Sequence, residues 1–117
     1  MKKRIQSFVY AGRGIRLVGS EPNMRIHVIV AILVVIFGFF FDISITEWIS
    51  CLLCIGLVFS AEMINTAIEN VVDLVSPNYN ELAAKAKDIA AGAVLISAII
   101  SVIIGLLIFL PKVWNLL

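Results

Sequence analysis

Five of the polar side chains in residues 55–73, a largely apolar stretch with the pattern of a helix, could share one face. They are Glu62, Asn65, Thr66, Glu69 and Asp73. At roughly 100° of rotation per residue, all five fall within roughly 100° of arc on one helical face. A carboxylate at the centre of a membrane helix costs on the order of 2.5–3.5 kcal/mol and usually marks a functional site. The spacing therefore predicts a functional polar stripe; the alternative is a polar contact between packed helices or a solvated helix end.

Phosphoryl transfer is one chemistry that such a stripe supports. It needs a hard cation held by a few carboxylates, positive charge near the phosphates, and a group that orients or deprotonates the acceptor hydroxyl. The chain supplies suitable groups in Glu21, Glu62, Asn65, Glu69, Lys87 and Asp88. No P-loop and no protein-kinase signature is present, so a kinase built on this chain would be an unrelated solution.

The composition indicates that these groups are carried by membrane helices. The chain has 117 residues, of which 62% are hydrophobic, and a mean hydropathy of +1.08. Its apolar runs approach the roughly 20 residues that span a bilayer. We predict an all-α membrane protein with a single domain over residues 1–117. Its helices, which include the spans, are expected at about 26–41, 48–75 and 86–110.

Other features of the composition are less informative. The net charge of +1 says nothing specific about partners, and no nucleic-acid partner is expected. Cys51 and Cys54 have no further Cys or His nearby that could complete a zinc site, so we interpret them as small apolar core residues. The single His27 is interpreted as a structural residue at the interface.

The basic residues predict the orientation in the membrane. Six precede the first apolar run, two lie in the connection 76–88, and none lies in the connection 42–47. The positive-inside rule therefore places the N-terminus and the connection 76–88 in the cytoplasm. The lower end of the polar stripe would face the same side, which predicts an active site at the cytoplasmic face of the inner membrane.

Glycine and proline set the expected ends of the helices. Residues 1–20 are predicted to form an amphipathic surface helix, with a break at Gly12 and Gly14. Pro22 is expected at the first position of the next helix, capped by Ser20 or Glu21. Prolines are also expected to end the second and third spans, at positions 77 and 111. A stripe of small residues four apart in the third span predicts close packing between helices. It consists of Ala93, Ser97, Ser101 and Gly105.

Two motifs carry a resemblance to a known family. They are E-x-x-N-T-A-I-E-x-V-V-D at residues 62–73 and A-K-D-I-A-A-G-A-V-L at residues 86–95. Together they resemble the small prokaryotic diacylglycerol kinases, a family that includes undecaprenol kinases. The resemblance implies a homotrimer, with three transmembrane helices and a surface helix per subunit and with sites built between neighbours. It also implies transfer of the γ-phosphate of ATP to the primary hydroxyl of a membrane lipid alcohol, either diacylglycerol or undecaprenol.

The resemblance also implies roles for individual residues. Glu62 matches the proton acceptor for the lipid hydroxyl, and Asn65 matches a position that organises the site. Glu21 and Glu69 match the carboxylates that bind the divalent metal, for which oxygen ligands favour Mg²⁺, together with its nucleotide. The remaining nucleotide-binding positions are Tyr10, Asn78, Tyr79, Asn80, Lys87 and Asp88. The form E-P-N-M-R-I-H at residues 21–27 is more similar to the undecaprenol kinase branch.

Two other classes of protein compete with the kinase. A small proton-coupled multidrug or ion transporter can use a membrane glutamate, but needs it near the midplane and accessible from both sides. Here the acidic residues gather towards one interface, beside Lys87 and Asp88. An accessory subunit without chemistry would leave the polar stripe of residues 62–73 unexplained. Phosphate incorporation from ATP into a lipid extract separates all three.

Overall fold

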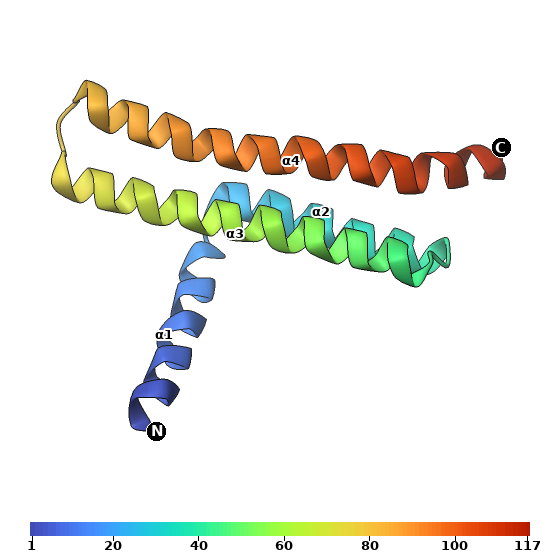
Figure 1. The fold of residues 1–117 in the computed structure, drawn as a ribbon, viewed down its shortest axis with the longest axis horizontal. Coiled ribbons are helices and arrows are strands. Elements are labelled where there is room, and N and C mark those ends of the chain that lie inside the picture. Colours follow the sequence, from blue (N-terminus) through green and yellow to red (C-terminus); the bar gives the residue numbers. More distant parts are fainter.

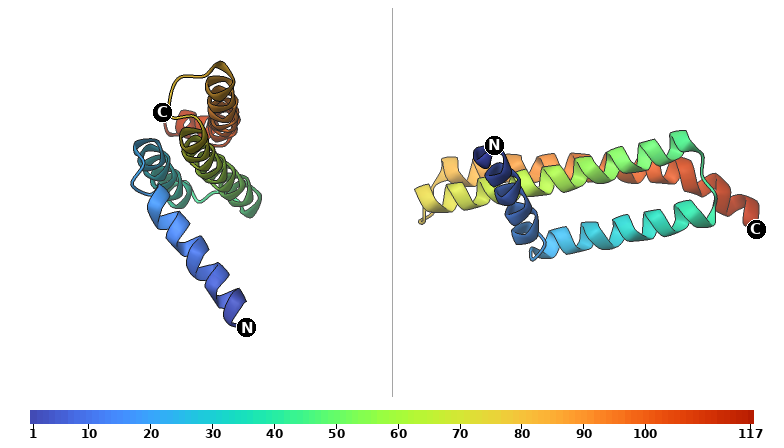
Figure 2. Two further views of the ribbon diagram at one scale, coloured as in Figure 1. Left: turned by 90° about the vertical axis from the view of Figure 1, so that its left-hand side faces the viewer. Right: turned by 90° about the horizontal axis from the view of Figure 1, so that it is seen from below.

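The chain folds into four helices joined by short connections. The computed structural model describes all of residues 1–117, with α1 at Lys2–Val18, α2 at Pro22–Phe40, α3 at Ile45–Val75 and α4 at Glu81–Leu116. α3 and α4 run side by side in opposite directions, α2 packs on α3, and α1 leaves the bundle at a steep angle (Figures 1 and 2). The predicted all-α architecture is confirmed.

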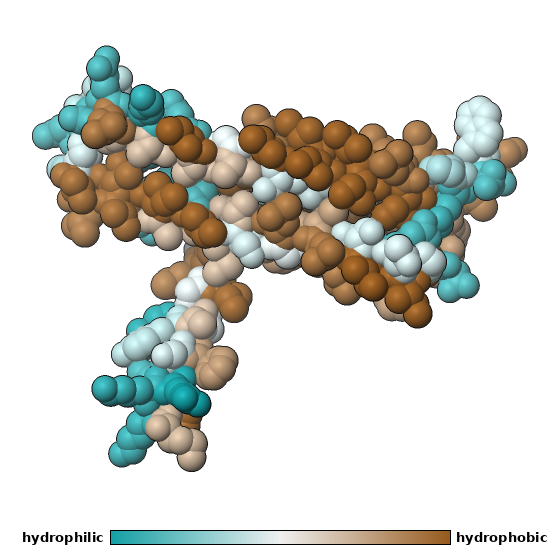
Figure 3. Space-filling model, viewed as in Figure 1, coloured by the Kyte–Doolittle hydropathy of each residue, from teal (hydrophilic) through white to brown (hydrophobic).

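Three of the helices, α2, α3 and α4, are long and apolar enough to cross a membrane. Only 11 of the 117 residues are buried within the chain, and many large apolar side chains are exposed. Figure 3 shows these side chains as a wide apolar surface over the middle of the bundle, with hydrophilic residues at its two ends and along α1. An apolar surface of this extent needs lipid or protein around it, and the chain is a multi-pass membrane protein.

Local capping explains where the helices begin. Glu21 is the N-cap of α2 and Pro22 occupies its first turn, as expected from the sequence. α3 opens with a capping box: the Ser44 Oγ accepts from the Glu47 backbone N–H at 3.2 Å, and the Glu47 Oε1 accepts from the Ser44 N–H at 3.0 Å. In α4 the Asn80 Oδ1 accepts from two backbone N–H groups, those of residues 82 and 83. α4 therefore begins at Glu81, earlier than the expected residue 86.

Two expected breaks do not occur. α1 continues through Gly12 and Gly14, because glycine in a helix interior costs only about 1 kcal/mol and keeps its backbone hydrogen bonds. Pro111 does not close the third span; it lies inside α4, which runs on to Leu116. The residue after the proline pairs with α3. Lys112 Nζ contacts the Glu47 Oε2 at 2.8 Å, which holds the end of α4 against the first turn of α3.

The small core lies at this same end of the bundle. Ile43, Cys51 and Ile108 form its buried centre. Both cysteines are free, and the buried Cys51 confirms its interpretation as a core residue. Gly38 is required here, since a Cβ atom at this position would lie 2.5 Å from the Trp48 Cη2. The core therefore fixes α2 against α3 at the end remote from the polar stripe.

Candidate active site

Two residues of the polar stripe of α3 are buried among the helices. Glu62 is 2% exposed and Asn65 is 5% exposed. The Asn65 Nδ2 donates to the Glu69 Oε1 at 3.1 Å, one helical turn away. The sequence prediction that these three side chains form one polar face is therefore confirmed, and the face lies against the other helices rather than in open water.

Two buried oxygens of this face have no hydrogen-bond partner within the chain, the Glu62 Oε2 and the Asn65 Oδ1. A buried polar atom without a partner costs roughly 1–3 kcal/mol, and more when it is charged. Native structures rarely accept that cost unless a ligand, an ion or water completes the site. Both oxygens are acceptors, so the site is suited to a donor such as a hydroxyl group or to a cation.

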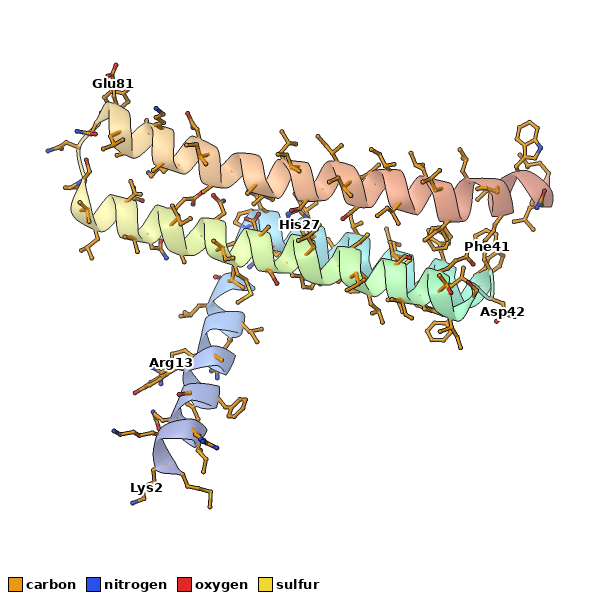
Figure 4. All side chains as sticks on the ribbon, in the orientation of Figure 1. Lys2, Arg13, His27, Phe41, Asp42 and Glu81 are labelled. Carbon is orange, nitrogen blue, oxygen red and sulfur yellow. The ribbon has the colours of Figure 1, made fainter.

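His27 of α2 is the closest polar neighbour of the Glu62 carboxylate. Its Nε2 lies 3.5 Å from the Glu62 Oε2, with side-chain exposures of 19% for His27 and 3% for Glu62. Figure 4 labels His27 where α2 passes α3. The sequence provided no signal for this contact, because the two residues are far apart along the chain and only the packing of α2 on α3 brings them together.

His27 also lies in an apolar groove between α2, α3 and α4. The groove has a volume of about 500 Å³ and is lined by 19 residues, 16 of them hydrophobic. Ser101 and Gly105 of the small-residue stripe line it as well, while Ser97 is buried and donates its hydroxyl to the Ala93 carbonyl at 2.9 Å. Within one chain, part of the small-residue stripe therefore faces a groove rather than a packed helix.

Lys87 of α4 forms an ion pair with Asp73 at the end of α3. The Lys87 side chain is 39% exposed and that of Asp73 is 60% exposed, so the pair contributes little to stability. The sequence places Asp73 in the polar stripe but did not predict its contact with Lys87. The pair lies in line with Glu69 and Glu62 along α3 and extends the charged surface away from the apolar groove.

The other predicted nucleotide residues are not gathered around Glu62 in one chain. Tyr79 is 85% exposed and lines a shallow depression with Asp88 near the start of α4. The Asn80 side chain caps α4, and the Asn78 carbonyl accepts from the Ser76 hydroxyl at 3.0 Å. Tyr10 lies on α1, which points away from the bundle (Figure 1). Its ring lies 5.5 Å from the Arg13 guanidinium carbon.

The two carboxylates expected to bind metal are both half-buried. No group of three or more His, Cys, Asp or Glu side chains in the chain is arranged to hold a metal ion. Glu21 and Glu69 nevertheless fit the way Mg²⁺ is bound at phosphate sites, where one or two carboxylates act together with phosphate oxygens and water. Asn65 engages only the Oε1 of Glu69, and its own Oδ1 remains an unpartnered hard oxygen.

Comparison with known proteins identifies the family. A family model described as prokaryotic diacylglycerol kinase matches residues 9–109. The chain belongs to this family. It is 50% identical over 113 residues to an undecaprenol kinase of Bacillus subtilis (strain 168), covering 96% of this chain and 92% of that protein.

Diacylglycerol kinases are more distant relatives. One from Synechocystis is 39% identical over 95% of this chain and 65% of its own length. One from Escherichia coli K12 is 32% identical over 85% of this chain and 82% of its own length. The chain is therefore an ATP-dependent lipid kinase with membrane-embedded helices, as the two motifs predicted. The relatives give no support to the transporter alternative.

Proposed function

We propose that this kinase transfers the γ-phosphate of ATP to undecaprenol, with Glu62 as the proton acceptor. The observation that carries the proposal is a buried carboxylate with a free acceptor oxygen, beside an apolar groove that contains a single neighbouring histidine. A long polyprenyl chain needs an extended apolar surface, whereas its hydroxyl needs a base shielded from bulk water. The higher identity to an undecaprenol kinase than to diacylglycerol kinases supports this choice of lipid.

The proposed reaction couples proton transfer to Glu62 with attack on the γ-phosphorus of ATP. The hydroxyl of the lipid donates its proton to the Glu62 Oε2, and its oxygen attacks the γ-phosphorus of ATP. A new oxygen–phosphorus bond forms as the bond between the γ-phosphorus and the β,γ-bridging oxygen breaks, and ADP leaves. A positioned carboxylate that accepts the hydroxyl proton in this way acts as a general base.

The nucleotide belongs, in this proposal, along α3 from Glu69 towards the connection to α4. Glu21 and Glu69 would hold Mg²⁺, which neutralises charge on the phosphates when bound. Asn65 keeps Glu69 in place through its hydrogen bond. Lys87 and Asp88, with Tyr10 and the connection that contains Asn78, Tyr79 and Asn80, would contact the rest of the nucleotide. The Asn65–Glu69 hydrogen bond and the Lys87–Asp73 ion pair follow each other along α3 towards α4 and support this order.

The assembly that we propose is a homotrimer in the inner membrane with its sites at the cytoplasmic face. The large exposed apolar area of each chain and the departure of α1 from its own bundle support contacts between subunits. α1 carries basic and polar residues among apolar ones, as expected of an amphipathic helix on the membrane surface. Tyr10 on that helix would serve the site of a neighbouring subunit.

Competition between lipids tests the choice of substrate. The purified kinase is reconstituted with equal amounts of undecaprenol and diacylglycerol, and γ-labelled ATP is added. We expect label chiefly in undecaprenyl phosphate, because a single long polyprenyl chain suits one continuous apolar groove, whereas diacylglycerol carries two acyl chains. A preparation of Glu62→Gln controls for contaminating kinases. Preferential labelling of phosphatidic acid would contradict the proposed substrate and leave the lipid kinase activity itself in place.

Mixing of inactive subunits tests whether the site is shared. Glu62→Gln and Lys87→Ala subunits, each inactive alone, are dissociated, mixed in equal amounts and reassembled. If Glu62 of one subunit acts with Lys87 of the next, about a quarter of the sites in random trimers hold both intact residues, because each partner is correct half of the time. We therefore expect about a quarter of wild-type activity. No recovery in trimers shown to be mixed would place both residues of a site in one chain.

A further inference from the structure

The contact between His27 and Glu62 leaves the buried carboxylate oxygen without a close hydrogen bond. Their facing atoms are 3.5 Å apart, and the Glu62 Oε2 has no hydrogen-bond partner. One hydroxyl oxygen can lie within about 2.7–3.0 Å of both atoms, which are the distances of good O–H···O and N–H···O bonds. Such a hydroxyl would donate to the carboxylate and accept from the imidazole Nε2–H. Neither hydrogen bond competes with the other, because a hydroxyl group is both donor and acceptor.

The groove continues from this point in the direction that a lipid chain requires. The groove lining extends from His27 in α2 to Phe41, the residue after the last one of α2. This corresponds to about 21 Å at 1.5 Å per residue. Figure 4 labels both residues, one near the start of α2 and the other at its end. His27 and Ser101 are the non-cysteine polar groups in the lining, and a Cβ atom on Gly105 would meet no atom within 4 Å. One end of the groove is thus marked by His27, whose Nε2 lies 3.5 Å from the Glu62 Oε2.

From this arrangement we propose that His27 binds the lipid alcohol directly. Its Nε2–H donates to the substrate oxygen and turns the hydroxyl proton towards the Glu62 Oε2, while the chain of the same lipid lies in the groove. The assignment rests on the proposed role of Glu62 as the base. It adds a hydroxyl-binding residue on α2, and it places the lipid chain in a groove formed by a single subunit.

Replacement of His27 tests the hydroxyl contact. His27→Leu removes the donor at similar volume, and we expect the KM for undecaprenol to rise about tenfold, as for the loss of one hydrogen bond. The KM for ATP should stay unchanged, since the lost contact is to the lipid. His27→Gln keeps an N–H donor and should recover most of the affinity, whereas a purely structural contact would show in thermal unfolding instead. His27→Ala serves as a second variant if His27→Leu does not fold.

Ser50→Ala is the control, because Ser50 lies on α3 outside the groove and its hydroxyl donates to the Thr46 carbonyl, so the lipid KM should stay unchanged. Equilibrium binding of undecaprenol with a non-hydrolysable ATP analogue gives a second readout that does not depend on turnover. An unchanged lipid KM and binding constant in His27→Leu, with turnover lost in Glu62→Gln, would overturn the inference and leave the base assignment intact. Full turnover in Glu62→Gln would instead remove the proposed base, whatever the result at His27.

Filling the groove tests the path of the chain. Gly105→Leu places a side chain in open space within the groove, and we expect it to raise the KM for undecaprenol several-fold. A short polyprenol that ends before this position should be unaffected by Gly105→Leu but still respond to His27→Leu. A changed mass of the assembly in Gly105→Leu would show that a second copy of the chain occupies the groove, and would overturn the lipid path.

Discussion

Glu62→Gln is expected to lower lipid phosphorylation by about 10²–10⁴-fold, the usual range for loss of a positioned general base. Glutamine keeps the size of the side chain and its buried position but cannot accept the hydroxyl proton. The affinity for ATP should survive, because Glu62 contacts His27, which lines the apolar groove, and is assigned to the lipid rather than to the nucleotide. Turnover and ATP binding are therefore measured on the same preparation, the first by label transfer and the second by equilibrium binding.

Glu47→Gln is the control for this experiment. Glu47 lies on the same helix but at its opposite end, where it caps α3 and pairs with Lys112. Glutamine also serves in a capping box, so this variant should fold and keep normal turnover. Near-normal turnover in Glu62→Gln would refute the base assignment. Lost ATP affinity with normal turnover at saturating ATP would move Glu62 to the nucleotide side.

Glu69→Gln and Glu21→Gln are expected to raise the Mg²⁺ concentration needed for half-maximal activity by at least about 10–100-fold. Loss of a residue that merely supports a metal ligand commonly costs that much in metal affinity, and these two would be ligands themselves. In Glu69→Gln the side-chain oxygen can still accept from the Asn65 Nδ2, so the substitution removes charge and keeps the local hydrogen bond. The fold should be nearly unaffected.

Titration of activity with Mg²⁺ at fixed ATP measures this effect, and thermal unfolding checks the fold. High Mg²⁺ should partly restore both variants, whereas it should not restore Glu62→Gln. Removal of the metal with a chelator should abolish wild-type turnover reversibly. If both variants keep normal activity at low Mg²⁺, Glu21 and Glu69 do not bind the metal.

Much of the architecture follows from local sequence, because it depends on interactions between near neighbours. Long apolar runs specify helices that suit a bilayer, and Pro22 marks the first turn of α2. The helical period alone places Glu62, Asn65 and Glu69 on one face. Where the expectations were wrong, a local propensity was overridden. Gly12 and Gly14 only weaken a helix, and Pro111 is accommodated where Lys112 secures the end of α4 against α3.

Only the tertiary structure decided which distant groups meet. The burial of Glu62 beside His27 depends on how α2 packs on α3, and the Lys87–Asp73 pair depends on how α4 aligns with α3. The groove exists because α2 and α4 stand apart while α3 contacts both (Figure 2). Helical periodicity says which side chains share a face, but it contains no information about what that face meets. That depends on contacts between residues far apart in the chain, for which neither spacing nor composition provides a rule.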